Sequence, residues 1–190
     1  MGYALISHTE PNATAGGPLT AAGADNVFAD GKINAVDSNA DAVVVSLSGV
    51  TFQFALALGI YRIRAVITFC CTNAMDLLSG RAVLYNVTRA TIQNNISAVG
   101  SPNVNGGLPI TSTSLVLADN ASTQNGTAMI IGRFAVLNAT EVYSIRLAGV
   151  TSASGAGTDW FSNAFAQGAI SAVTAGSINN KFKDIEILKE

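Results

Sequence analysis

The sequence predicts an all-β antiparallel fold, a sandwich or a barrel, from two observations. Over most of the chain, short apolar segments are separated by clusters of Gly, Asn, Asp and Ser, and no segment of useful length has a helical period. The clearest segment, Ile60–Phe69, alternates between apolar residues such as Tyr61 and Ile63 and polar residues such as Arg62 and Arg64. Short strands between turn signals are typical of sandwiches and barrels.

The composition indicates a protein that works by association. The chain has 190 residues, of which 49% are hydrophobic and 12% charged, whereas about 25% of the residues of a typical soluble domain are charged. A free monomer with so few charges would expose apolar patches, which usually mark interaction sites. We therefore expect burial in an oligomer or on a larger particle. The net charge of −2 argues against a nucleic-acid partner, which requires a basic face.

The first forty residues are expected to form an extended arm. Met1–Ala40 lacks strong strand or helix periodicity and contains Gly16, Gly17 and Pro18. We therefore divide the chain into an arm, residues 1–40, and one domain, residues 41–190. The arm would lie on a neighbouring subunit or on a surface, and a terminus without a role is the alternative.

The domain is expected to consist of short strands in chain order. They are Ala42–Leu47, Thr51–Leu56, Ile60–Phe69, Gly80–Val87, Thr91–Ile96, Ser112–Leu117, Ala128–Leu137, Glu141–Leu147 and Lys181–Lys189. Ala128–Leu137 is apolar on both faces, which suits a central strand or a subunit contact. Asn138–Ala139 predicts a tight turn between two strands.

Two segments rich in Gly, Ser and Asn, Val99–Leu108 and Ala148–Asn180, predict loops. A loop as long as the second is usually functional or disordered. Its centre contains the only tryptophan, Trp160. An aromatic residue in a polar loop forms either a plug on the end of the fold or a contact with a partner.

The most hydrophobic window, Ala42–Ile60, is not expected to insert into a membrane. Ser48–Gly49 interrupts it as a turn would, and its Val and Phe residues favour strands. Met1–Thr20 has neither the basic region nor the continuous apolar region of a secretory signal, so we expect an intracellular place of synthesis and assembly.

The residues that chemistry requires do not occur in suitable patterns, so we predict that the chain is not an enzyme. A Ser-His-Asp triad needs a histidine, and the one histidine, His8, falls in the expected arm. Cys70 and Cys71 are adjacent and have no partners at zinc-site spacing, so we expect buried free thiols. Gly100–Gly107 lacks the Lys-Ser/Thr of a phosphate-binding loop. We therefore assign no catalytic, cofactor-binding or metal-binding residue.

Four segments in order resemble a recurrent bacteriophage virion domain, found at the ends of tail fibres and in related phage structural proteins. They are Leu58–Arg64 (LGIYRIR), Gly80–Thr88 (GRAVLYNVT), Gly132–Val136 (GRFAV) and Asp184–Ile187 (DIEI). The resemblance extends over Ala42–Glu190. The chain departs from the family pattern at Leu188, where the family has Trp, and at Cys70–Cys71 with Asn73–Leu78, where the family has a more basic hairpin.

The resemblance implies a jelly roll of tumour-necrosis-factor type that forms a homotrimer, made in the host cytoplasm and carried in the virion. We expect Arg62 and Arg64 to pair with Glu186 or Asp184 on a neighbouring strand and not to touch a substrate, and exposed ion pairs of this kind contribute about 0–1 kcal/mol each. A capsid decoration or head-fibre protein, bound to the major capsid protein or another shell protein through the arm, is the function expected first.

Two alternatives remain. A receptor-binding tail-fibre tip would be preceded by a shaft of heptads or β-helical repeats, and this sequence contains none. A carbohydrate-binding or carbohydrate-active module on the same fold would need converging carboxylates or an aromatic platform around Trp160, with a host-surface glycan as its partner.

Overall fold

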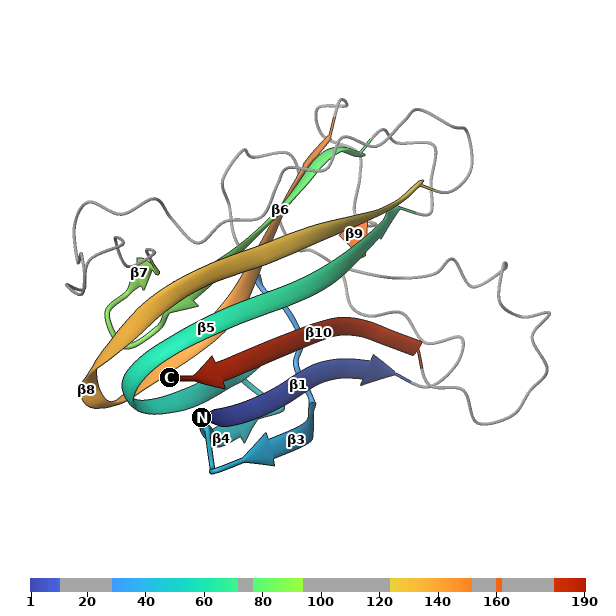
Figure 1. Ribbon diagram of the computed structural model, residues 1–190. Coiled ribbons are helices and arrows are strands. Elements are labelled where there is room, and N and C mark those ends of the chain that lie inside the picture. The colour runs from blue at the N-terminus through green and yellow to red at the C-terminus, as the bar shows by residue number, and fades with distance from the viewer. Residues whose placement is uncertain (11–28, 72–76, 94–123, 152–159, 162–179) are drawn as a thin grey trace.

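Within the described residues, the regular elements are antiparallel β-strands (Figure 1). The computed structural model describes residues 1–10, 29–71, 77–93, 124–151, 160–161 and 180–190. The strands are β1 (Gly2–Glu10), β2 (Ala29–Asp30), β3 (Ala35–Ala40), β4 (Val44–Ser48), β5 (Gln53–Cys71), β6 (Leu77–Asn86), β7 (Thr91–Ile92), β8 (Gln124–Thr151), β9 (Trp160–Phe161) and β10 (Asn180–Lys189). This part of the chain contains no helix that would reach across a membrane.

The strands form two layers because β5 and β8 bend and pass from one layer to the other (Figure 1). Layer A has the order β3-β1-β10-β5-β8 and uses residues 59–71 of β5 with residues 124–136 of β8. Layer B uses residues 53–57 of β5 and 140–151 of β8, with β6 and β7 on one side of β8 and β2, β5 and β4 on the other. The predicted all-β antiparallel sandwich is confirmed.

The two bends lie opposite each other in one corner of the sandwich. Residues 137–139 of β8 face Leu58 of β5, so β8 carries extra residues there, as in a β-bulge. Gly59 has a φ of +157°, and a Cβ at this position would lie 2.9 Å from Cε of Lys189. The hydroxyl of Tyr61 donates a 2.8 Å hydrogen bond to the carbonyl of Ala57 across the same bend. Both strands therefore turn the corner without ending.

This corner corrects two expectations. Asn138–Ala139 is not a tight turn between two strands, because β8 continues through it as a bulged strand. Similarly, the two strands predicted from residues 51 to 69 are the two halves of β5. A bulge bends a strand without reversing it, and its small polar residues resemble those of a turn.

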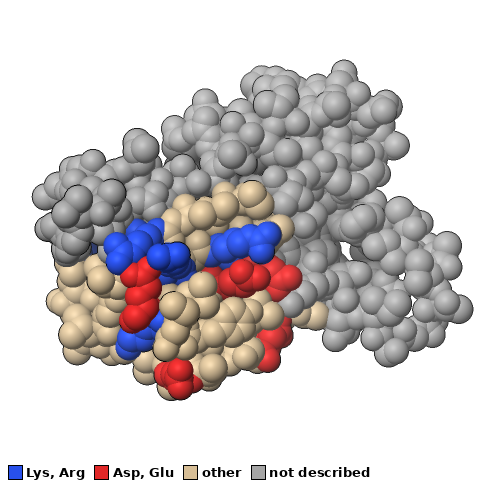
Figure 2. All heavy atoms as spheres, viewed as in Figure 1, with Lys and Arg blue, Asp and Glu red and all other residues tan. Residues whose placement is uncertain are grey.

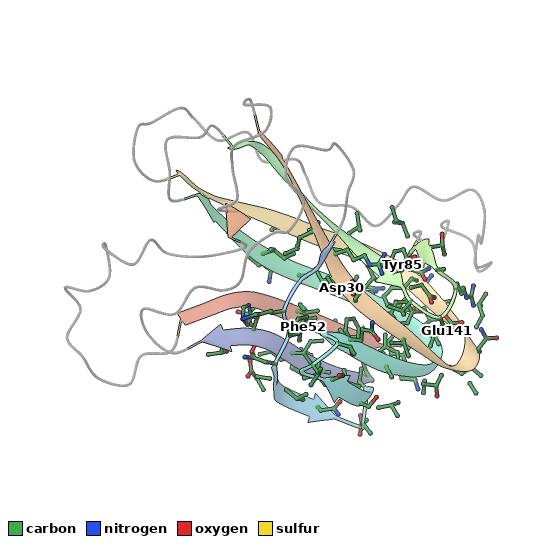
Figure 3. All side chains as sticks on the ribbon, turned by 180° about the vertical axis from the view of Figure 1, so that it is seen from behind. Asp30, Phe52, Tyr85 and Glu141 are labelled. Atoms are coloured by element: carbon green, nitrogen blue, oxygen red, sulfur yellow. The ribbon has the colours of Figure 1, made fainter. Side chains whose placement is uncertain are left out.

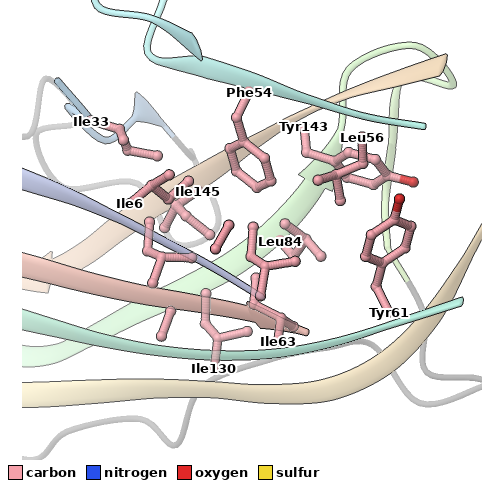
Figure 4. Packing of buried hydrophobic residues seen from close by; sticks show 14 of the residues in the cluster. Ile6, Ile33, Phe54, Leu56, Tyr61, Ile63, Leu84, Ile130, Tyr143 and Ile145 are labelled. Atoms are coloured by element: carbon pink, nitrogen blue, oxygen red, sulfur yellow. The ribbon is translucent and has the colours of Figure 1, made fainter. Parts of the chain in front are cut away.

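The core lies between the two layers (Figure 4). Its centre is a run of aromatic rings from both layers: Tyr61 stacks on Phe134 with centroids 5.8 Å apart, Phe134 meets Tyr143 at 5.3 Å, and Tyr143 stacks on Phe54 at 6.0 Å. Burial of a side chain of this size contributes about 1.5–3 kcal/mol. The aliphatic residues around the rings include Ile6, Ile63, Leu84, Ile130, Ile145, Leu147, Ile185 and Ile187.

The expected arm is wrong where the structure describes it. Gly2–Glu10 is β1, an interior strand between β3 and β10, and the side chains of Ala4 and Ile6 are 0% exposed. Ile6 pairs with Ile185 of β10, so the first and last strands of the chain bury one apolar face together. Ala35–Ala40 is β3, the edge strand of layer A. Residues 11–28 of the expected arm lie outside the described residues.

Several other expectations are only partly tested. Ser112–Leu117 and Val99–Leu108 lie outside the described residues. Thr91–Ile96 is described only as far as residue 93, with β7 limited to Thr91–Ile92. Of the expected loop Ala148–Asn180, residues 148–151 continue β8, and Trp160–Phe161 form β9, which pairs with Cys71 and Cys70.

Candidate interaction surface

Three of the four segments that resemble the phage domain form neighbouring strands in layer A. Leu58–Arg64 lies in β5, Gly132–Val136 pairs with it from β8, and Asp184–Ile187 pairs with it from β10. The fourth segment forms most of β6 in layer B and the turn after it. Segments far apart in the sequence are therefore adjacent, because β5 lies between β8 and β10 in layer A and β6 pairs with β8 in layer B.

The outward side chains of β10, β5 and β8 in layer A form one surface, here named the open face. The inward side chains of the same strands, such as Tyr61, belong to the core. Figure 2 shows this side of the molecule, where basic side chains (blue) and acidic side chains (red) lie beside one another among uncharged residues. The open face includes Arg62, Arg64, Val66, Met129, Ile131, Arg133, Asp184, Glu186 and Leu188, with Glu190 at its margin.

Glu190 joins the two arginines that face each other across β5 and β8. Its carboxylate accepts hydrogen bonds from Nε of Arg62 at 2.6 Å and from Nε of Arg133 at 3.0 Å, and Nη2 of Arg133 bonds the same group. Hydrogen bonds from Arg133 and Arg62 lower the pKa of Glu190 to about 2. The hydrogen bond with Glu190 likewise raises the pKa of Arg133. This cluster remains charged at ordinary pH.

One of the two expected arginine pairings is confirmed. Nη1 of Arg64 lies 3.6 Å from Oε1 of Glu186, the partner opposite it in β10. Arg62 pairs with Glu190 instead of Glu186 or Asp184, because Leu188 is the residue opposite Arg62 in the β5–β10 register. The side chains of Arg64 and Glu186 are 57% and 41% exposed, so this pair contributes about 0–1 kcal/mol to stability.

The apolar residues of the open face have no such internal partners. Ile131 is 58% exposed and Met129 is 39% exposed, next to each other on β8 and opposite Arg64 and Val66 of β5. Arg62 and Arg133 bond Glu190, and Arg64 lies beside Glu186, so a second apolar surface could cover Ile131 and Met129 without leaving these arginines unpaired. The open face therefore has the chemistry of an association surface.

A second polar cluster is buried at the corner and surrounds Glu141, whose side chain is 0% exposed (Figure 3). Its Oε1 accepts two hydrogen bonds from Arg89, one of them from Nε at 3.1 Å. Its Oε2 accepts from Nδ2 of Asn86 at 2.6 Å and from the hydroxyl of Tyr143 at 2.9 Å. The cluster joins the end of β6 to β8.

Glu141 also closes the bulge of β8. Its Oε1 accepts hydrogen bonds from the backbone N–H of Leu137 at 3.3 Å, and from the backbone N–H and side-chain amide of Asn138 at 3.1 and 2.9 Å. The bulge leaves these backbone groups without ladder partners, and the carboxylate supplies one. With donors on both oxygens, Glu141 is a structural group and not an available base.

The electrostatics of Glu141 agree with that role. Burial alone would raise its pKa, but hydrogen bonds from Arg89, Asn86 and Tyr143 outweigh burial, and the pKa is lowered. Burial raises the pKa of Tyr143 strongly, and the adjacent negative charge of Glu141 adds to the increase. The group is therefore a buried carboxylate beside a neutral phenol.

The Asn-Val-Thr part of the resemblance has a clear structural role. The side chain of Asn86 accepts a hydrogen bond from the backbone of Arg89 at 3.0 Å, which holds the turn after β6. Val87 donates its backbone N–H to the carbonyl of Val142 at 2.8 Å, and the hydroxyl of Thr88 accepts the N–H of Val142 at 2.8 Å. These residues attach the turn to β8.

Glu141 was not among the residues predicted from the sequence, although its position in the strand pattern carries a signal. Glu141 has the same odd-numbered spacing as Tyr143, Ile145 and Leu147, which all point into the core. A carboxylate on the inward face of a strand requires partners. Among the described residues, no group of three or more His, Cys, Asp or Glu is arranged to hold a metal ion.

Comparison with known proteins gives no family. No protein-family model matches the chain, and no curated protein matches it. Among solved structures, the globular domain of zebrafish complement 1qA protein is similar, with a TM-score of 0.40 and 9% identity over 98% of this chain and 94% of that one. A TM-score this low assigns neither a fold family nor a function to this chain.

Proposed function

We propose that this chain is a structural subunit of a bacteriophage particle, which forms a homotrimer through the open face and decorates the capsid. The segments that resemble the phage virion domain support the phage origin. The low share of charged residues, 12%, supports a subunit that is largely covered in its assembly.

The single observation that carries the proposal is the exposure of Ile131 and Met129 on the open face. These residues lie in a regular strand directly before Gly132–Val136, one of the segments that resemble the phage domain, and beside arginines that are already paired with glutamates. Stable interfaces bury roughly 800 Å² per partner around an apolar centre with a polar rim. In the proposed trimer, Ile131 and Met129 are the apolar centre, and the cluster of Arg62, Arg133 and Glu190 belongs to the rim.

Residues Gly2–Glu10 are not proposed as the part of the chain that attaches to the capsid. Gly2–Glu10 is an interior strand, and removing it would open layer A between β3 and β10. A deletion of these residues would therefore unfold the domain and would not test attachment. We propose the major capsid protein, or another shell protein, as the partner of the assembled trimer.

The experiment is immunogold labelling of intact phage particles with an antibody against the purified protein. The expected result is label distributed over the capsid. Label confined to the fibre tips would contradict capsid decoration and favour a receptor-binding role. Adsorption of the purified protein to host cells would then test that role. Absence of label from both the capsid and the fibre tips of purified particles would contradict a role in the virion.

A further inference from the structure

The outward face of layer B carries a polar cluster at the place where β2, β5 and β6 meet β8. In the strand register, Arg146 of β8 lies opposite Asp30 of β2, and Ser144 lies opposite Tyr85 of β6 and Gln53 of β5. Seen from behind, Figure 3 shows Asp30 and Tyr85 near this half of β8. The five residues are separated by up to 116 positions in the sequence, so only the fold brings them together.

The guanidinium of Arg146 is fixed in one orientation. It lies over the ring of Tyr85, with its carbon Cζ 3.4 Å from the ring centroid. Its Nε donates a 2.8 Å hydrogen bond to Oδ1 of Asp30, and the hydroxyl of Ser144 donates to the same oxygen at 2.8 Å. A stacked arginine with a paired Nε loses little further freedom when it binds a ligand, so it is pre-organised.

The remaining polar groups of the cluster have no hydrogen-bond partner among the described residues. They are the two Nη groups of Arg146, Oδ2 of Asp30, the hydroxyl of Tyr85 and the side-chain amide of Gln53. The side chains of Arg146 and Asp30 are 27% and 28% exposed, so solvent reaches them. Fixed donors and a fixed acceptor therefore stand side by side at the surface.

We propose that this cluster binds a neutral saccharide through a pair of adjacent hydroxyl groups. One hydroxyl accepts a hydrogen bond from an Nη group of Arg146, and its neighbour donates to Oδ2 of Asp30. The hydroxyl of Tyr85 and the amide of Gln53 contact the same sugar from either side of Ser144. The ring of Tyr85 does not stack on the sugar, because Arg146 already covers its face.

The charges of the cluster favour a neutral ligand over an acidic one. Arg146 and Asp30 carry opposite charges and are in direct contact, so together they have no net charge. A hydroxyl pair gains a charge-assisted hydrogen bond from each of them and adds no charge to the site. A ligand carboxylate would lie close to the negative charge of Asp30. It also has no proton to donate to Oδ2 of Asp30, whereas a hydroxyl has one.

The test is saturation-transfer NMR of the purified full chain with the methyl glycosides of glucose, mannose and galactose. Methyl glucuronide serves as the acidic comparison, because it differs from the glucoside in its carboxylate. Transfer to at least one neutral glycoside is expected, and the glucuronide should bind more weakly than the glucoside. Absence of transfer to all three neutral glycosides, or stronger binding of the glucuronide, overturns the proposal.

Variants then locate the site. Asp30→Asn and Arg146→Lys are each expected to weaken binding about tenfold, the effect of losing one hydrogen bond to a charged group. Tyr85→Phe removes only a hydroxyl and should weaken binding a few-fold. Because the change is small, this variant is used in place of Asp30→Asn or Arg146→Lys if a thermal melt shows that either of them does not fold. Asp41→Asn, in the exposed turn between β3 and β4, is the matched control and should bind as the wild type does. Unchanged binding in Asp30→Asn and Tyr85→Phe places the saccharide elsewhere and contradicts the site.

Discussion

Glu141 and Arg89 form a buried ion pair between the bulge of β8 and the turn after β6. Removal of one partner of such a pair leaves the other without compensation and costs about 3–5 kcal/mol. The loss also removes the acceptor for the backbone N–H groups of Leu137 and Asn138. The pair therefore stabilises the corner at which both long strands change layers.

The substitution Glu141→Gln should lower the free energy of unfolding by about 3 kcal/mol, because an amide cannot accept hydrogen bonds at both ends. Chemical denaturation measures this value. Glu186→Gln, which breaks the exposed pair with Arg64, is the control and should cost less than about 1 kcal/mol. Equal losses in the two variants would show that Glu141 does not hold the corner.

The protein should lose stability in acid. The pKa of Glu141 is lowered by its hydrogen bonds despite burial, and that of Glu190 is lowered to about 2 by Arg133 and Arg62. A carboxylate with a lowered pKa binds protons more weakly in the folded state, so its contribution is present above the unfolded pKa of about 4.3 and disappears as the pH falls toward the folded value.

Denaturation curves measured across this acid range should show the midpoint falling below a pH of about 4. In Glu141→Gln the fall should be shallower, since one of the two groups no longer titrates. A wild-type midpoint that rises as the pH falls through this range would contradict the assignment.

Ala42→Gly should stabilise the protein. Asp41 and Ala42 join β3 to β4 with φ values of +58° and +48°, a left-handed turn that costs an alanine about 1–2 kcal/mol. Glycine adopts this conformation without the Cβ clash, so thermal denaturation should show a gain of about 1 kcal/mol. Ala35→Gly in β3, where φ is not positive, is the control and should destabilise. Destabilisation by both variants would mean that the turn carries no such strain.

Alternation predicted the orientation of β5 correctly because its two faces differ sharply, with arginines on one side and apolar residues on the other. β1 was missed because both faces of Tyr3–Ile6 are apolar, so the period of two is hidden. The bulge at Asn138 resembled a turn because small polar residues are common in both, and the one sign of Glu141, which completes the bulge, was its alternation with Tyr143 and Ile145.

Neither candidate surface could be predicted as a whole from the sequence. Arg64 and Glu186 were expected as partners because each lies on the charged face of an alternating strand. Asp30 and Arg146 were not, since β2 has only two residues and no recognisable pattern. A contact that depends on the register of three strands has no local signal in the chain.

Self-association through the open face is the central claim, and the mass of the native protein in solution tests it most directly. Light scattering should give three chain masses for the wild type and one chain mass for Ile131→Asp, which puts a charge at the centre of the open face. Val50→Asp, at an equally apolar residue that is 87% exposed in the turn before β5, should remain trimeric. A monomeric wild type, or a trimeric Ile131→Asp, would contradict the account.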